Sequence, residues 1–390
     1  MKKVLLIQYS GDLDGSCTSG LLLLNGLRRA GFETHAAFGV PGPAMETYIQ
    51  EGHRVYEVPH RKWLSHGTIR HSLHDVLHHF LLARKLGAHI DAIGPDLVYV
   101  NTVVSLGGIL AARSRGVSCI WHLRELLSFV GGEMKVPRIF YPAVQRIISG
   151  FPDAVVAPSR VVANTLVGNA RAPRVHIVPN AVADCFFAEQ RSRHEARADL
   201  GLPQQGRMIG VPGMLRKVKG HAFCFEAVQS LLAADPQMRL VVTGKGTPDY
   251  EAQLHALARE LHIEQQVLFL GVLQDMPAFY RACDVVCVPS RSEPFGRTVI
   301  EAMAVGTPVV ASAVDGILET ITPDENGLLV PYGDVGLLSS SLARVLGDDE
   351  LATRLGERGR CVARERYHES AYQAALQSLV EEVLARRKTI

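Results

Sequence analysis

The stretch around residues 285–311 limits the fold of this chain more than any other. It contains a buried apolar strand, Val285–Val288, then a polar loop, an apolar helix and a second apolar strand that begins at Val309. Short β-branched runs joined through a loop and a helix are typical of the parallel sheets of α/β folds. In such sheets the loop after a strand lies at the carboxyl edge, which is where ligands bind.

The start of the helix in this stretch is suited to a phosphate. A turn of Pro294, Phe295 and Gly296 precedes it, and Arg297 and Thr298 follow. The first amides of an α-helix have no partner within the helix and bind anions readily. We therefore expect the amides of residues 296–298 to contact a phosphate.

Two carboxylates flank this predicted phosphate site. Glu293 lies in the loop before the turn, and Glu301 lies one turn into the helix. Ionised carboxylates accept hydrogen bonds and sugar hydroxyls donate them, so each carboxylate suits one part of a phosphorylated polyol. The alternative is a capped helix in which Glu293 marks the start and Glu301 is solvated.

The stretch resembles the Glu-x7-Glu motif of the retaining glycosyltransferases of family four, which have the two-domain GT-B fold. The resemblance implies that Glu293 contacts hydroxyls of the donor sugar and that Glu301 contacts the ribose. It also implies that the backbone from Phe295 to Thr298 holds the diphosphate.

Length and composition fit two globular α/β domains. The chain has 390 residues, of which 47% are hydrophobic, enough for two cores. The net charge of +2 comes from dispersed residues, which argues against nucleic acid as a partner. Seven cysteines without paired spacing predict reduced thiols in the cytoplasm. We expect no signal peptide and no membrane span, while a peripheral contact with the inner membrane face stays open.

The first strand, Val4–Gln8, runs into a glycine-bearing loop that includes Gly15 and Ser16 and then into a helix from about Ser19. Glycine lets the backbone approach a ligand closely, although the Gly-x-Gly-x-x-Gly spacing of dinucleotide-binding loops is absent. The resemblance implies that Gly15 and Ser16 touch the donor or the acceptor.

The same loop contains Asp12 and Asp14, an Asp-x-Asp pattern that binds a divalent ion in the other large glycosyltransferase fold. That motif lies in the middle of its domain, whereas this one directly follows the first strand. We favour ordinary turn chemistry here and predict no metal and no other cofactor.

Polar groups end another predicted strand at His122, Arg124 and Glu125. Side chains at the carboxyl ends of parallel strands face the ligand site, although a single histidine there is often structural. The segment also resembles the Trp-His-x-Arg-Glu segment of family four. There the histidine lies close to the donor sugar, and the arginine and glutamate lie towards the acceptor.

An earlier helix, predicted over residues 69–83, carries His71, His74 and His78 on its polar face. The alternatives for these histidines are a metal site, binding to an anionic surface near pH 6, and a polar outer helix face.

Residues 184–205 lose hydrophobic periodicity and carry several arginines, so we predict an interdomain linker there. The predicted organisation is a Rossmann-like acceptor-side domain over residues 1–185 and a Rossmann-like nucleotide-sugar domain over 186–367. The last helix, residues 368–390, crosses back to the first domain in the GT-B fold.

The second domain opens with a strand and a basic loop that contains Arg216 and Lys219. Cations in a glycine-bounded loop neutralise a diphosphate, while a solvated basic turn is the alternative. The loop resembles the Gly-Arg-Leu-x-x-x-Lys-Gly motif of family four, in which Lys219 matches directly. Met214 stands where the motif has arginine, and Arg216 is positioned to replace that charge.

Two further segments extend the resemblance. Gly244 follows the next strand, and Val272 and Leu273 belong to the segment whose backbone holds the nucleobase in family four. The segment Val314-Asp315-Gly316 replaces the Gly-Gly pair that is common in the family.

We therefore predict a retaining, metal-independent hexosyltransferase that uses a nucleoside-diphosphate sugar and a sugar, lipid-linked or small-molecule acceptor. Glu293, His122, Lys219 and Arg216 are its expected catalytic residues. Cell-surface polysaccharide or glycoconjugate synthesis is the expected setting. A non-catalytic nucleotide-sugar-binding subunit and a nucleotide-sugar epimerase are the alternatives, and the base, the acceptor and the oligomeric state stay undetermined.

Overall fold

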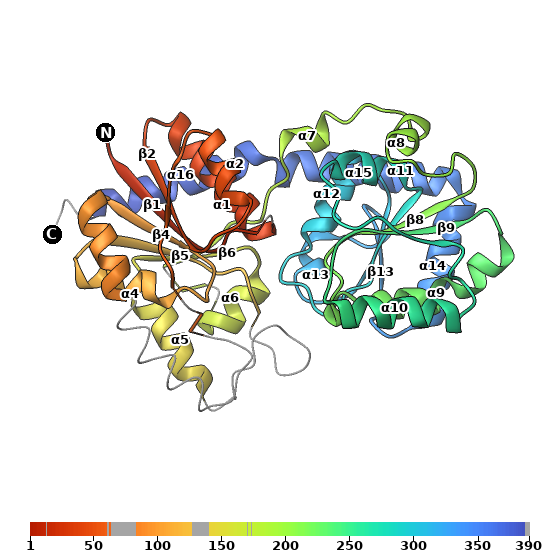
Figure 1. Cartoon of the computed structure of the whole chain (residues 1–390), viewed down its shortest axis with the longest axis horizontal. Helices are drawn as coiled ribbons and strands as arrows, with labels where there is room; N and C mark the ends of the chain where they lie inside the picture. The colour runs from red at the N-terminus through yellow and green to blue at the C-terminus, as the bar shows by residue number, and fades with distance from the viewer. Residues whose placement is uncertain are drawn as a thin grey trace. The chain divides into compact units, whose positions relative to one another are not determined.

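The computed structural model describes residues 1–12, 14–60, 62–63, 83–126, 140–169, 171–172 and 174–386. His71, His74 and His78 lie outside these residues. The chain forms two compact units, one of Met1–Asn180 with Glu369–Ile390 and one of Ala181–His368. Figure 1 shows both, each with a sheet covered by helices.

The first unit is built on a parallel sheet with the strand order β3-β2-β1-β4-β5-β6-β7 among the described residues. The strands are β1 (Lys3–Ser10), β2 (Glu33–Val40), β3 (Arg54–Glu57), β4 (Leu97–Asn101), β5 (Ser118–His122), β6 (Ala154–Ala157) and β7 (Val175–Ile177). β4 and β5 are buried along their whole length, as continuous apolar strands of a doubly covered sheet should be.

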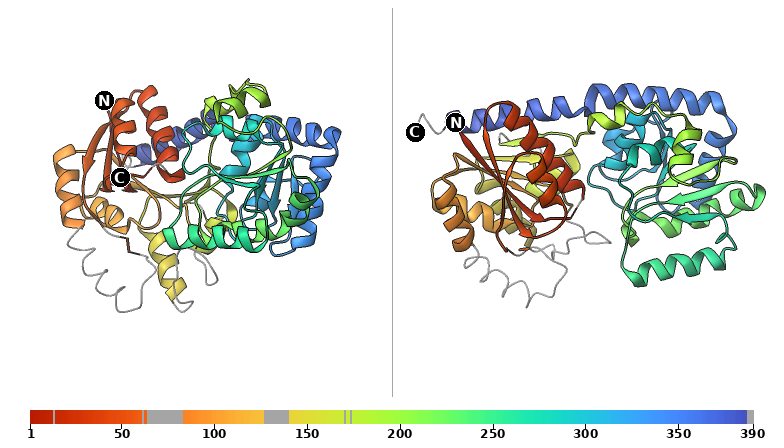
Figure 2. Two further views of the ribbon diagram at one scale, coloured as in Figure 1. Left: turned by 45° about the vertical axis from the view of Figure 1, so that its right-hand side comes forward. Right: turned by 45° about the horizontal axis from the view of Figure 1, so that its top comes forward.

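The helices of this unit are α1 (Gly15–Arg29), α2 (Ala44–Gln50), α4 (Leu106–Ser114), α5 (Tyr141–Gly150), α6 (Arg160–Val167) and α16 (Glu369–Arg386). Residues 83–93 are also helical. The C-terminal helix α16 packs on α1 (Figure 2), where Arg29 Nη2 donates to Gln373 Oε1 at 2.5 Å. The last helix of the chain is therefore part of the N-terminal unit.

The second unit is built on a parallel sheet with the order β10-β9-β8-β11-β12-β13. Its strands are β8 (Met208–Val211), β9 (Arg239–Val242), β10 (Val267–Phe269), β11 (Val285–Val288), β12 (Val309–Ser312) and β13 (Leu328–Val330). Its helices are α7 (Asp184–Phe187), α8 (Arg193–Asp199), α9 (His221–Ala234), α10 (Pro248–Glu260), α11 (Met276–Ala282), α12 (Arg297–Val305), α13 (Ile317–Thr320), α14 (Val335–Gly347) and α15 (Asp349–Tyr367), with a short 3₁₀ helix, η2 (Lys217–Lys219).

A hydrophobic core lies on each face of this sheet, between the strands and the helices that cover them. α9, α10 and α14 pack on one face, and α11, α12 and α15 pack on the other (Figure 1). The strand order reverses between β8 and β11, so the helices that follow these neighbours lie on opposite faces. Such a switch point leaves the carboxyl ends of both strands open to a ligand. The prediction of two Rossmann-like α/β domains is confirmed.

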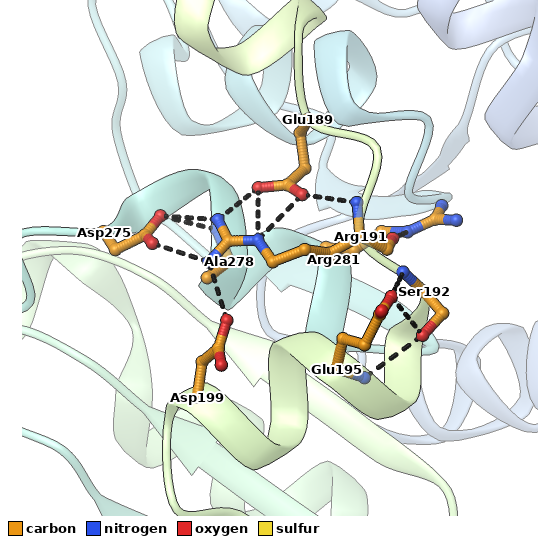
Figure 3. Close-up of polar contacts among 8 residues, drawn as sticks. All are labelled: Glu189, Arg191, Ser192, Glu195, Asp199, Asp275, Ala278 and Arg281. Carbon is orange, nitrogen blue, oxygen red and sulfur yellow. Dashed lines mark hydrogen bonds and ion pairs between the residues drawn. The ribbon is translucent and has the colours of Figure 1, made fainter.

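The prediction of a linker over residues 184–205 is wrong, because this segment folds onto the second unit as α7 and α8. Arg191 pairs with Glu189, Asp199 and Asp275, as Figure 3 shows, and so ties the segment to the start of α11. Nearby Arg197 is buried and pairs with the buried Asp284 at 2.8 Å. The arginines that suggested a solvated linker are partners of carboxylates in this unit.

Candidate functional site

The loops after β8 and β11 lie against each other at the switch point of the second unit. Gly220 has a φ of +74°, and a Cβ added to it would lie 1.9 Å from Pro289 O, so only glycine fits there. Arg291 N donates to Val218 O at 2.8 Å. These backbone contacts bring two loops that are far apart in sequence into one site.

The two most important predicted residues of this unit meet in that site. Lys219 Nζ lies 2.6 Å from Glu293 Oε2, and Ser290 Oγ donates to the same oxygen at 3.2 Å. The side chain of Lys219 is 26% exposed and that of Glu293 is 11% exposed, so the ion pair is partly open to water. An anionic ligand with more than one negative charge can compete with Glu293 for the lysine.

The start of α12, where we predicted a phosphate site, has no side-chain cap. Its N-cap is Gly296, with a φ of +94°, and no side chain caps the helix. Thr298 is half-buried in the first turn. The ring of Phe295 packs edge-on against Tyr367, with centroids 5.7 Å apart, so Phe295 offers a ligand only its backbone.

Glu301 is held by two donors. Tyr280 OH donates to Oε2 at 2.8 Å, and Arg297 Nε donates to Oε1 at 2.7 Å. Burial and the charge of Glu301 raise the pKa of Tyr280 well above its usual value, so the phenol stays a donor. Arg297 therefore brings a charged side chain to the site in addition to its amide. Tyr280 was not predicted, because nothing in the sequence of α11 indicates the bond.

The predicted nucleobase segment adjoins the same edge of the sheet. Gly244 N donates to Gly271 O at 2.7 Å, so the loops after β9 and β10 are neighbours. Val272 is largely exposed, and Leu273 is partly buried. Met214 and Arg216 are exposed in the adjacent loop after β8.

In the first unit, Gly15 and Ser16 are the first residues of α1 rather than members of a loop. Asp14 is the N-cap, and its carboxylate accepts from Ser16 N at 2.8 Å and Cys17 N at 2.9 Å. Asp12 accepts from Ser10 Oγ. Asp14 thus caps the helix and Asp12 bonds a nearby hydroxyl. No group of three or more histidine, cysteine or acidic side chains that could hold a metal occurs within the described ranges.

His122 ends β5 and is completely buried. Its Nδ1 lies 2.7 Å from Tyr99 OH and 3.2 Å from Arg124 Nη2. A guanidinium only donates, so Nδ1 is an acceptor and the neutral ring carries its proton on Nε2. Burial and the charge of Arg124 hold the pKa of His122 well below its usual value. Nε2 has no hydrogen-bond partner among the described residues.

Arg124 and Glu125, predicted on the acceptor side, are engaged within the first unit. Arg124 donates to Asn101 Oδ1 at 2.6 Å, to Asn180 Oδ1 at 2.7 Å and to Tyr372 OH of α16 at 3.1 Å. Glu125 Oε2 accepts from the backbone amides at positions 103 and 124. Both residues hold the strand ends around His122 in place.

Thr102, at the end of β4, was not singled out from the sequence. Its φ is +104°, which is unusual for a β-branched residue, and its buried hydroxyl has no partner within the described parts of the chain. Strained backbone and unpaired polar groups concentrate at functional sites. A polar strand end was the only signal in the sequence.

Comparisons with known proteins match both units of the chain. The model of Glycosyltransferase Family 4 matches residues 15–184, and that of Glycosyl transferases group 1 matches residues 192–362. A D-inositol 3-phosphate glycosyltransferase of Xylanimonas cellulosilytica is 30% identical over 377 residues, which cover 91% of this chain and 88% of that protein. The chain belongs to glycosyltransferase family 4.

Solved structures of glycosyltransferases share the fold. HepE of Anabaena, in complex with UDP and glucose, superposes with a TM-score of 0.84 at 22% identity and covers 98% of this chain and 100% of HepE. WaaG, a glycosyltransferase involved in lipopolysaccharide biosynthesis, gives 0.74 at 18% identity, over 96% of this chain and 98% of WaaG. The predicted GT-B fold and the predicted family are both confirmed.

As a family 4 glycosyltransferase, the protein performs sugar transfer. The structure places Lys219 against Glu293 and leaves the start of α12 without a side-chain cap. No helix in the described ranges is both long and apolar enough to span a bilayer.

Proposed function

We propose that this glycosyltransferase transfers a hexosyl unit from a nucleoside-diphosphate sugar to an acceptor hydroxyl with retention of configuration. The observation that carries the proposal is the 2.6 Å contact between Lys219 and Glu293 beside the uncapped start of α12. It joins a cation and a helix start without a side-chain cap, which suit a diphosphate, to a carboxylate that suits sugar hydroxyls.

The leaving diphosphate gains negative charge as the glycosyl bond breaks. Lys219, the amides at residues 296–298 and, in our proposal, the exposed Arg216 stabilise that charge. One preorganised donor of this kind contributes roughly 2.7–4 kcal/mol to lowering the barrier. Glu293 then turns from Lys219 to the sugar, and Glu301 contacts the ribose.

We infer retention because Glu293, Glu301 and Lys219, the charged groups that we assign to the donor, bind its hydroxyls and phosphates in this proposal and do not act as a base. The bond from the anomeric carbon to the phosphate oxygen breaks while the acceptor oxygen bonds to the same face. The proton of the acceptor hydroxyl goes to the leaving phosphate oxygen. His122 does not compete for this proton, because Nδ1 accepts from Arg124 and Tyr99 and Nε2 carries hydrogen. Its Nε2–H is a donor for the sugar.

The relatives suggest which substrates to test first. HepE has been crystallised with UDP-glucose, and the relative from Xylanimonas is named for D-inositol 3-phosphate. We propose a nucleoside-diphosphate hexose as donor and a hydroxyl of a small polyol phosphate, a glycan or a lipid-linked sugar as acceptor. The protein then works in the cytoplasm, or at the inner membrane face when its acceptor is lipid-linked, in surface polysaccharide or glycoconjugate synthesis.

A thermal-shift screen of UDP-, GDP- and ADP-sugars identifies the donor. Transfer of radiolabelled sugar from that donor is then measured with D-inositol 3-phosphate and with lipid-linked acceptors. We expect one nucleotide class to stabilise the protein and to support both slow donor hydrolysis and transfer. Tight donor binding with neither reaction would contradict the proposal and favour a non-catalytic binding role.

A further inference from the structure

The loop after β12 holds the loop that carries Glu293. Asp315 Oδ2 accepts from Ser292 Oγ at 2.6 Å and from the backbone amide of Glu293 at 3.0 Å. In return, Gly316 N donates to Glu293 O at 3.0 Å. Both backbone polar groups of Glu293 are thus bonded to two adjacent residues of another loop.

The local sequence makes this close contact possible. Asp315 has a φ of +40°, in the left-handed region that aspartate tolerates better than most residues with a Cβ. A Cβ added to Gly316 would lie 2.3 Å from Pro294 O, so the backbone approach requires glycine there. The family's common Gly-Gly pair allows the same backbone path without supplying a carboxylate.

Lys219 has two competing partners in the proposed reaction. Without ligand its ammonium pairs with Glu293 Oε2 at 2.6 Å. A bound diphosphate attracts the same ammonium more strongly, because it carries more negative charge. The ion pair therefore weakens when the donor binds, at the time when Glu293 must keep a defined direction. The bonds to Asp315 do not involve Lys219 and survive this exchange.

We propose that Asp315 is a positioning residue that fixes the backbone of Glu293 and so keeps its carboxylate directed at the donor sugar after Lys219 turns to the diphosphate. Asp315 itself touches no substrate. Its carboxylate bonds are charge-assisted and so stronger than neutral ones. This inference rests on the proposed role of Glu293 and adds a residue to it.

The first test is kinetic, with three variants. Asp315→Gly keeps the permissive backbone and removes the carboxylate, Asp315→Asn keeps an acceptor oxygen, and Ser292→Ala removes only the neighbouring bond. We expect Asp315→Gly to lower kcat about tenfold, because small misplacements of a reacting group are costly. Affinity for the nucleoside diphosphate without sugar, measured by calorimetry, should stay within about twofold. Asp315→Asn should recover most of the rate, and Ser292→Ala should stay close to the wild type.

The second test does not depend on activity. Hydrogen exchange of the Glu293 amide, measured by NMR, should become faster in Asp315→Gly and stay protected in Asp315→Asn. Unchanged protection in Asp315→Gly would overturn the inference, as would a wild-type kcat. An equal loss of diphosphate affinity would show a general structural role and overturn it as well. A wild-type protein that transfers no sugar would refute the proposed function, while the exchange measurement would still decide whether Asp315 holds Glu293.

Discussion

The two units hold their polar side chains in different ways. In the second unit the ion pairs Lys219–Glu293 and Arg297–Glu301 join oppositely charged groups that keep some exposure. In the first unit His122 is fully buried in a hydrogen-bonded network with Tyr99 and Arg124. A charged ligand can replace one partner of an ion pair, whereas a buried network keeps its geometry. The difference supports our proposal that the second unit binds the charged part of the donor and that the first presents fixed groups.

The helix starts show the same contrast. The first amides of α1 are occupied by the carboxylate of Asp14, so this helix start is already neutralised by its own chain. α12 begins at Gly296 without any side-chain cap. A helix start without a side-chain cap suits an anion better than one that is already capped by a carboxylate. We accordingly assign the diphosphate to the second unit.

The largest effect should come from Glu293→Gln. The amide keeps the shape of the side chain but accepts sugar hydroxyls less strongly, so transfer should fall below detection, on the order of 10³-fold or more. Affinity for the nucleoside diphosphate should change little, because Lys219 stays in place and loses only a competitor. Transfer is measured with radiolabelled donor, and affinity by calorimetry.

Glu325→Gln is the matched control, since Glu325 is exposed and pairs with Arg358 away from the site. It should behave as the wild type. Near-normal turnover of Glu293→Gln would show that Glu293 is not a site residue and that its ion pair with Lys219 is only structural.

Lys219→Ala comes next in size. The diphosphate is charged in the ground state and more so in the transition state, so both binding and kcat should suffer, with kcat/KM about 10²-fold lower or more. The neighbouring exposed Lys217 gives the control Lys217→Ala, which should stay close to the wild type. Steady-state kinetics and calorimetry with the free diphosphate report both effects.

Arg216→Ala sharpens the assignment within this loop. It should resemble Lys219→Ala if Arg216 replaces the arginine that the family motif has at Met214. Wild-type kinetics for Arg216→Ala would assign that charge to another residue, for which Arg297, with its side chain beside Glu301, is the next to test.

The sequence predicted the elements with continuous burial well and the side-chain partners poorly. β11 has the predicted bounds, Val285–Val288, because it is a short, fully buried apolar run. β3 was missed because it is a half-exposed edge strand without a continuous apolar pattern. The bonds from Asp315 and Tyr280 to the two glutamates were missed for another reason, since they join loops and helices whose proximity depends on the tertiary fold.

His122→Ala should have a smaller effect on rate and none on stereochemistry. Removal of the Nε2–H donor should lower kcat about tenfold, as the loss of one hydrogen bond to the substrate does. The product should keep the anomeric configuration of the donor, which proton NMR of the first-formed glycoside reports. Because the pKa of His122 lies well below its usual value, kcat of the wild type should show no His122 ionisation between about pH 6 and 8.

An inverted product in the wild type would contradict this mechanism. A base on the face opposite the leaving group would then be required, and His122 or Glu125 would have to supply it. The buried network of the first unit would then have to rearrange during the reaction. The first unit would no longer differ from the second in keeping its polar groups fixed.

The smallest effect should come from Asp14→Asn, which tests whether the carboxylate at the start of α1 is a helix cap or a metal ligand. Asparagine caps a helix about as well as aspartate, so stability should be unchanged, whereas Asp14→Ala should lower the free energy of unfolding by about 1 kcal/mol. A metal ligand behaves differently, because asparagine lacks the charge that holds a divalent ion. We therefore expect wild-type transfer from Asp14→Asn, and wild-type activity that survives EDTA. Activity that is lost in Asp14→Asn, and lost on chelation but restored by manganese or magnesium, would make Asp12 and Asp14 a metal site and would move the charge-binding function into the first unit.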